Sequence, residues 1–387
     1  MRGIAAVLMI FNHAGFRLLS PAELSGTPEA VAVFLGGFAP VVFFFATGFG
    51  IALSRPASGR PPEIASLLWK AALLVVADQF FFWTRGLAWG LDFFSFIAIA
   101  SVVVTVVARL RQPARVCAAL IALLVALRYG LGPAIRSELH SFAFLDWVIG
   151  ANAVERVSYP LSPWMVYPLL GFLLGRLYKS VDLQSPQPRN QWLRRGSIAM
   201  LGLFGVSLLL AMFNNSFFRW GSVSFGFFVV SIGIVVAAGL LSMYLMMSHR
   251  RIAQALALRG VASFAVIPLH YGMLAVFAAG LDLPIGQLGF AALAVLIIVV
   301  SFRASSWFAE AVASGPVASR RQSLLPVMLA LLAALVVATL LEEVRALVPV
   351  IVLLLLGQLL VAAILGMRPG KRAPVDGAAL AARLPAA

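Results

Sequence analysis

The chain has 387 residues, of which 62% are hydrophobic and only 11% charged, and its mean hydropathy is +1.00. A soluble protein of this size could not cover its surface with so little charge, so the composition predicts a polytopic membrane protein. The formal net charge of +15 does not indicate nucleic-acid binding, because the basic residues stand between apolar runs, where the positive-inside rule places them. The single cysteine excludes an intramolecular disulfide framework, and four scattered histidines lack zinc-ligand spacing, so no metal site is expected.

The first apolar segment, residues 2–19, carries Asn12 and His13 among Leu, Ile, Met and Phe. It lacks an A-x-A-like cleavage site, so we expect a retained span rather than a cleaved signal. An ionisable group at mid-membrane depth is costly and by default indicates a functional site. Arg2 precedes His13 by eleven residues, so both share one helix face at an axial offset of about 16 Å. Arg17 lies one turn beyond His13 on that face. We therefore expect these side chains to face the same space; a histidine packed between helices is the structural alternative.

Apolar runs of about 20 residues, the length of a membrane-spanning helix, recur along the chain. They predict an all-α membrane protein with about twelve spans (10–12), near residues 2–19, 30–53, 64–84, 91–109, 113–130, 161–178, 196–213, 221–247, 260–281, 286–303, 324–341 and 346–367. The tenth span is expected to be followed by a surface helix around 305–313.

Lys and Arg cluster in alternate connections, such as 109–115 and 250–251, whereas the other connections carry few, mostly balanced by acids. This asymmetry predicts cytoplasmic N- and C-termini in a multi-pass protein of the plasma (inner) membrane. Four regions are expected: a first bundle over 1–178, a flexible cytoplasmic linker over 179–195, a second bundle over 196–368, and a disordered tail over 369–387.

Other polar and small residues inside the spans have open interpretations. Asp78 could orient His13 or pair with an arginine, and Asn12 could serve catalysis or interhelical hydrogen bonding. Trp164 is typical of an interfacial anchor but is also a candidate ligand contact. Gly171 and Gly175 have the spacing of a helix-packing face, and Gly48 would let a backbone approach closely.

Several motifs in order resemble those of transmembrane acyltransferases. Arg2-Gly3-Ile4-Ala5 with Asn12-His13, followed by FFFATGF at 43–49, is similar to the opening motifs of acyltransferase family 3 and of the related heparan-α-glucosaminide N-acetyltransferase-like proteins. PLSPWMVYPLLGFLLGR at 160–176 and LRG at 258–260 with PLHY at 268–271 resemble later helices of the second branch. The resemblance covers roughly residues 1–275.

This resemblance implies transfer of an acyl group, usually acetyl or succinyl and here expected to be acetyl, from cytoplasmic acyl-CoA to a hydroxyl or amine of a sugar, a glycan or a related envelope acceptor. It implies His13 as base or transient acyl acceptor and Arg2 as part of the donor site. The chemistry agrees, because a buried imidazole stays neutral and can act as a base, which typically contributes 10²–10⁴-fold. Asn12 could fix the ring or meet an oxyanion. Arg2 could meet a CoA phosphate or anchor the helix at the lipid headgroups as a positive-inside residue.

The expected partners are acyl-CoA, the acceptor and the lipid bilayer. The candidate catalytic residues are His13 and Asn12, and the candidate binding residues are Arg2, Arg17, Asp78, Trp164 and His270. A secondary transporter or a flippase of a polar metabolite or glycan is the alternative function, suggested by about twelve helices in two bundles. No repeat of the Arg-Gly and Asn-His pattern supports it in the second half. The identity of the acyl group and the acceptor stays open.

Overall fold

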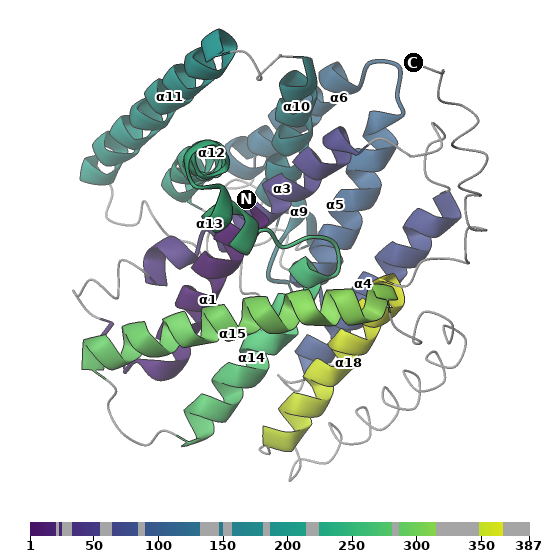
Figure 1. The fold of residues 1–387 in the computed structure, drawn as a ribbon. Coiled ribbons are helices and arrows are strands. Elements are labelled where there is room, and N and C mark those ends of the chain that lie inside the picture. The colour runs from purple at the N-terminus through teal and green to yellow at the C-terminus, as the bar shows by residue number, and fades with distance from the viewer. Residues whose placement is uncertain are drawn as a thin grey trace, which may run out of the picture.

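The computed structural model describes residues 1–20, 23–24, 33–54, 64–83, 90–131, 147–149, 157–180, 186–213, 224–280, 286–314 and 348–366. Within these ranges the chain is built from helices (Figure 1), and the extended pairing found there is an isolated parallel bridge between Leu91 and Val157. The prediction of an all-α fold is confirmed for the described part of the chain.

The helices follow one another in two sets, before and after residue 181. The first set is α1 (Arg2–Leu18), α3 (Ala39–Leu53), α4 (Ile64–Trp83), α5 (Phe93–Ala108), α6 (Pro113–Val125) with the π-helical continuation η1 (Ala126–Leu131), α9 (Leu161–Trp164) and α10 (Val166–Ser180). The second set is α11 (Pro186–Phe213), α12 (Phe225–Ser248), α13 (Arg250–Ala255), α14 (Ala262–Gly280), α15 (Gly286–Ser314) and α18 (Val348–Gly366).

Five helical stretches in the described part are long and apolar enough to cross a bilayer: Val33–Leu53, Ile64–Phe82, Pro113–Leu131, Phe225–Ser248 and Leu288–Ala313. Three further apolar helices are shorter, over Phe93–Ala108, Ala262–Ala278 and Leu355–Leu365. This is a multi-pass membrane protein. The expected span at 324–341 and the tail at 369–387 lie outside the described residues. The count of about twelve spans and the side of the membrane on which the termini lie remain predictions.

Two local expectations differ from the structure. The expected break between a tenth span and a surface helix at 305–313 is wrong, because α15 continues without interruption to Ser314. No Gly or Pro stands between 303 and 313 to end it, and the Ser305 hydroxyl bonds back to the Ser301 carbonyl within the same helix. The expected flexible linker at 179–195 is helical from residue 186, where α11 begins at Pro186, a residue type favoured in the first helical turn.

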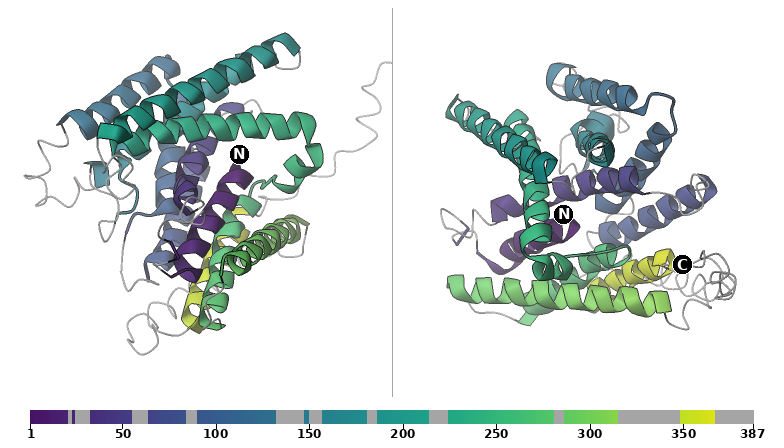
Figure 2. Two further views of the ribbon diagram at one scale, coloured as in Figure 1. Left: turned by 90° about the vertical axis from the view of Figure 1, so that its left-hand side faces the viewer. Right: turned by 45° about the horizontal axis from the view of Figure 1, so that its top comes forward.

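The helices of the two sets interlock instead of forming separate bundles. The first helix, α1, packs against α3, α14 and α15, while α4 packs against α5 and α18. One apolar core joins Ile10 of α1, Phe80 of α4, Phe94 of α5, Val266 of α14 and Val361 of α18. Figure 2 shows α1 inside the molecule, with the green and yellow helices of the second set beside it. The central position of α1 decides where its polar residues lie.

Two glycines allow α3 and α10 to touch through their backbones. A methyl group on Gly48 of α3 would lie 1.8 Å from the carbonyl oxygen of Pro168, and one on Gly171 of α10 would lie 2.1 Å from that of Phe45. A methyl group on Gly175 would lie 2.7 Å from the side-chain Cβ of Ala52 and 3.0 Å from the carbonyl oxygen of Phe49. The interpretation of Gly171 and Gly175 as a packing face is therefore confirmed. This contact fixes α3, which also packs against α1, α5 and α12.

Replacing Gly48 by Ala should lower the thermal stability of the detergent-solubilised full chain, because the added methyl group must displace the α10 backbone. Overpacking of this kind typically costs about 1–3 kcal/mol. Gly202→Ala is the matched control, since nothing described lies within 4 Å of a methyl group placed there. Equal melting temperatures for the two variants would contradict the close α3–α10 contact.

Candidate active site

The centre of the candidate site is a chain of hydrogen bonds between α1 and α14. His13 Nδ1 lies 2.8 Å from His270 Nε2, and His13 Nε2 lies 3.2 Å from the Tyr271 hydroxyl. His270 Nδ1 lies 2.9 Å from the carbonyl oxygen of Val266, one turn earlier in its own helix. His270 is fully buried and His13 is partly buried. Two histidines separated by 257 positions are thus in direct contact.

The direction of donation along this chain of hydrogen bonds follows from its buried end, at the Val266 carbonyl. The Val266 carbonyl can only accept, so Nδ1 of His270 carries a hydrogen, and Nε2 of a neutral His270 is an acceptor. His13 must then donate through Nδ1, which leaves the lone pair of its neutral ring on Nε2. That lone pair accepts from the Tyr271 hydroxyl. His270 therefore fixes both the tautomer and the orientation of the His13 ring.

Asn12 holds the same stretch of α1 from the other side. Its Nδ2 donates to the Val33 carbonyl over 2.6 Å. The segment beside Val33 approaches closely because of Gly36, where a methyl group would lie 2.5 Å from both Asn12 Cβ and the Leu8 carbonyl oxygen. The amide of Asn12 thus links α1 to the start of the next helical stretch. This contact supports a positioning role for Asn12.

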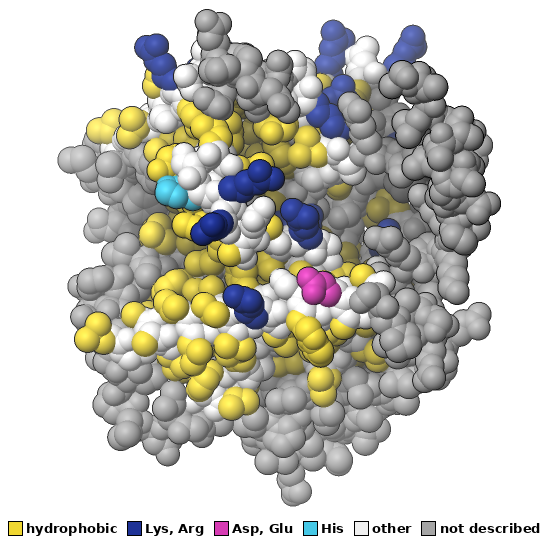
Figure 3. Space-filling view, viewed as in Figure 1, with side chains coloured by type: hydrophobic (Ala, Val, Ile, Leu, Met, Phe, Trp, Pro, Cys, Tyr) yellow, Lys and Arg dark blue, Asp and Glu magenta, His cyan; other side chains and the backbone are white. Residues whose placement is uncertain are grey.

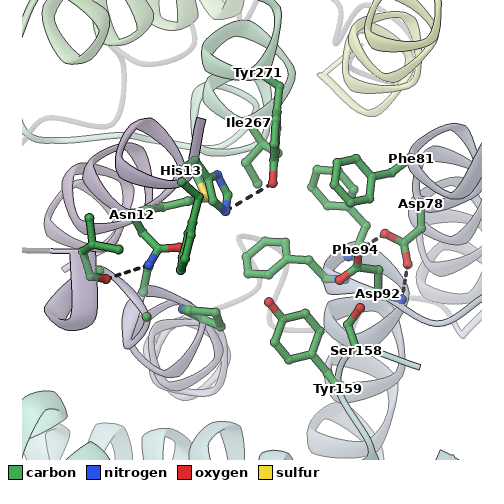
Figure 4. Close-up of a pocket in the computed structure, with 18 of the residues that line it drawn as sticks. Asn12, His13, Asp78, Phe81, Asp92, Phe94, Ser158, Tyr159, Ile267 and Tyr271 are labelled. Atoms are coloured by element: carbon green, nitrogen blue, oxygen red, sulfur yellow. Dashed lines mark hydrogen bonds between the residues drawn. The ribbon is translucent and has the colours of Figure 1, made fainter. Parts of the chain in front are cut away.

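His13 and Asn12 line a cavity of about 600 Å³. Figure 4 shows His13, Asn12 and Tyr271 on one side of it, and Asp78, Asp92, Ser158 and Tyr159 across from them. Apolar residues from several helices complete the lining, among them Met9, Phe16, Phe34, Phe81, Phe93 and Ile267. We call this space the histidine cavity. It places a basic nitrogen opposite carboxylates and hydroxyls inside an apolar bundle.

The far wall of the histidine cavity is held by α4. The carboxylate of Asp78 accepts from the backbone N–H groups of Asp92 at 2.8 Å, Phe94 at 3.2 Å and Ser95 at 3.1 Å. These are the first N–H groups of α5, which have no partner within the helix, and the positive end of the helix dipole favours a carboxylate there. The side-chain amide of Gln79 binds the Gly90 backbone twice: its Nε2 donates to the Gly90 carbonyl, and its Oε1 accepts from the Gly90 N–H. The Asp78 carboxylate therefore binds the N-terminal end of α5 and is not hydrogen-bonded to His13.

A second and larger cavity, of about 1280 Å³, lies at the other end of α1. Arg2 lines it, with the guanidinium beside Gly50 of α3, as do Arg195 and Arg259. Its remaining lining is mostly apolar and comes from α3, α10, α11 and α12. Figure 3 shows Lys and Arg side chains gathered on the face where α13 and the N-terminus of α1 lie. We call this space the arginine cavity; it can hold an anionic group at its basic side and an apolar chain within.

The predicted site residues are distributed as follows. His13, Asn12 and Asp78 line the histidine cavity, and His270 stands directly behind His13. Arg2 lines the arginine cavity, so Arg2 and His13 face two separate spaces and not the shared one expected from their spacing. Arg17 is exposed and lines neither cavity. Trp164 is fully buried and packs on Tyr159, with ring centroids 5.0 Å apart, so it lies behind the cavity wall and lines neither cavity.

Sequence reasoning missed several residues that line the histidine cavity. Tyr271 directly follows His270 in the PLHY motif at 268–271, and this position could have identified it as a candidate site residue. Asp92 precedes an apolar run, as the N-cap residue of a helix does, and this is a weaker indication of a place at the cavity. Nothing in the local sequence links Tyr159 or Gln358 to His13. Among the described residues, no group of three His, Cys, Asp or Glu side chains is arranged to hold a metal ion.

The fold and the site define a helical membrane protein with a histidine-lined cavity inside its bundle. The family model described as heparan-alpha-glucosaminide N-acetyltransferase, catalytic, matches residues 1–202, which is more than half of the chain. The protein belongs to this family of membrane acetyltransferases, and it is accordingly a transferase. Comparison with the curated proteins and with the solved structures found no match. The family match includes His13 and Arg2 but ends before His270.

Asp78→Leu should destabilise the protein, because three backbone N–H groups at the start of α5 would lose their acceptor. Each buried unsatisfied group costs roughly 1–3 kcal/mol, so a fall of several degrees in the melting temperature of the solubilised chain is expected. Asp78→Asn keeps one carbonyl oxygen and should lose less. If Asp78→Leu melted like the unmodified protein, the assigned capping role would be wrong.

Proposed function

We propose that the protein transfers an acetyl group from acetyl-CoA to an amine or hydroxyl of a sugar or glycan acceptor, in the plasma (inner) membrane, with His13 as the general base. The family supports a membrane N-acetyltransferase type of function and, in general, acetyl-CoA as donor. The observation that carries the role of His13 is its ring geometry. Nδ1 is held by His270 while Nε2, which carries the lone pair, points to Tyr271 beside the histidine cavity.

The proposed step is a direct acyl transfer. The acceptor nitrogen or oxygen attacks the thioester carbonyl, a C–N or C–O bond forms, and the C–S bond breaks. The acceptor proton passes to His13 Nε2, either directly or through the Tyr271 hydroxyl, and then to the leaving thiolate of CoA. The His270 contact keeps Nδ1 as the donor throughout, so Nε2 alone exchanges the proton. Base catalysis by a positioned histidine typically contributes 10²–10⁴-fold.

The arginine cavity is the candidate site for the donor. Arg2, Arg195 and Arg259 present guanidinium groups, which bind phosphate oxygens in a bidentate manner. The interior of that cavity is apolar and suits a flexible arm. His13 lies about 16 Å along α1 from Arg2, and the middle of α1 between them is buried. The helices around this stretch therefore have to part when the donor binds, so that its arm can bring the thioester to Nε2. Arg2 thereby keeps its predicted role in binding the acyl donor, at a distance from the reacting atoms.

His13→Ala should abolish acetyl transfer in membranes supplied with radiolabelled acetyl-CoA and glucosamine. His249→Ala is the matched control, because His249 is exposed, precedes α13 and lines neither cavity. Full acetyl transfer by His13→Ala would rule out His13 as the general base. Acetyl-histidine trapped by rapid quenching would show that His13 is a transient acyl acceptor and not a base. Uptake or efflux of a sugar without consumption of acetyl-CoA would indicate the alternative function, a secondary transporter.

His270→Leu should lower kcat by about two orders of magnitude and leave the KM for acetyl-CoA nearly unchanged, because the His13 ring loses the acceptor that sets its tautomer. His270→Gln should recover much of the activity, since the amide oxygen can accept from His13 Nδ1. The pH profile of kcat should move in His270→Leu and return in His270→Gln. Equal loss in both variants with an unchanged pH profile would show that His270 contributes packing only.

A further inference from the structure

The wall of the histidine cavity contains an amide whose nitrogen is hydrogen-bonded and whose oxygen has no partner among the described residues. Gln358 of α18 lines the cavity and is 1% exposed. Its Nε2 donates to the Ala77 carbonyl of α4 at 3.0 Å. This bond identifies the nitrogen, because a carbonyl can only accept, so the other amide atom is the oxygen. Among the described residues, no hydrogen-bond donor reaches Oε1.

A buried amide oxygen without a partner is uncommon in native proteins and calls for an explanation, such as a water molecule or a ligand. The surroundings show that Gln358 is held at this position. It is the only polar side chain in the helix Val348–Gly366. Gly357 brings this turn of α18 against Phe80, where a methyl group would lie 2.6 Å from the ring. A lone polar residue facing the interior of a membrane bundle is by default a functional candidate.

The charge of the histidine cavity narrows what such a ligand can be. No Lys or Arg occurs among its described lining residues. Asp92 lines it with a carboxylate that also caps α5 through the Phe93 N–H at 2.9 Å. Carboxylates and an amide oxygen are hydrogen-bond acceptors, so the wall favours a ligand that supplies donors and carries no negative charge. Hydroxyl groups and amines meet both conditions, whereas carboxylate and sulfate groups do not.

We propose that Gln358 is a specificity-determining residue of the acceptor site, where its Oε1 accepts a hydrogen bond from a hydroxyl or amine of an uncharged or cationic acceptor. The proposal rests on the proposed function, because it assigns the histidine cavity to the acceptor. Gln358 lies far beyond the residues that match the family. The second half of this chain thus contributes selectivity to a reaction centred on α1. Sites that hydrogen-bond a substrate hydroxyl discriminate strongly against analogues that lack it.

The test compares Gln358→Leu and Gln358→Met with Leu356→Ala in the purified full chain reconstituted in nanodiscs. Leu356 is on the same helix, is 47% exposed and does not line the histidine cavity. The probes are glucosamine, glucose and glucuronate as acceptors. Both Gln358 variants should raise the KM for glucosamine and glucose roughly tenfold, the effect of one lost buried hydrogen bond. The KM for acetyl-CoA and the release of CoA without acceptor should stay at wild-type values, and glucuronate should be a poor acceptor for all proteins.

A binding arm separates this proposal from the proposed function. Saturation-transfer NMR with the same three sugars measures acceptor binding even if no acetyl transfer occurs. Binding of glucosamine that is weakened in both Gln358 variants but not in Leu356→Ala supports the proposal whatever the activity. Unchanged glucosamine binding and an unchanged acceptor KM in both variants, or a preference for glucuronate, would overturn it. If the wild type binds the sugars but never transfers acetyl, the proposed function fails and the binding site stands.

Discussion

Inside an apolar helix bundle the nitrogen atoms of a histidine ring need hydrogen-bond partners, because the apolar side chains and lipid around them offer none. The contact between His13 and His270 meets this constraint for both rings at once. The Val266 carbonyl at one end of the chain of hydrogen bonds and the Tyr271 hydroxyl at the other give it a direction. The contact also ties α1, which lies in the family match, to α14, which lies outside it.

The same packing that buries α1 separates its two ends. Ala5, Ala6 and Ile10 are fully enclosed by neighbouring helices, while the arginine cavity lies at Arg2 and the histidine cavity at His13. Arginines line one space, and Asp78, Asp92 and Gln358 line the other. Within the described part of the chain, the Gln358 amide oxygen has no hydrogen-bond partner. This division suits a reaction in which an anionic acyl donor approaches one end of the helix. The acyl acceptor, which is not anionic and carries hydrogen-bond donors, approaches the other end. The proposed transfer then takes place where the acyl arm reaches His13.

The all-α fold was predictable from the sequence because it depends on local information. Hydropathy located the helices, and the depth of His13 marked it as costly. Arg2 and His13 share a helix face, but the buried middle of α1 closes the space between them, and a helical wheel does not contain that packing. Asp78 had no predictable partner because its partners are backbone N–H groups of α5. Gln358 meets Ala77 across 281 positions, a contact no local pattern reveals.

The most direct measurement is an experimental structure of the full chain with a thioether analogue of acetyl-CoA, which binds like the donor but cannot transfer its acetyl group. The account predicts the nucleotide phosphates beside Arg2 and the acetyl carbonyl carbon next to His13, at a distance that leaves room for an acceptor atom about 3–3.5 Å from both the carbonyl carbon and Nε2. The His13 ring should remain bonded to His270. An acetyl group that stays within the arginine cavity, remote from His13, would contradict the assignment of His13 as the base.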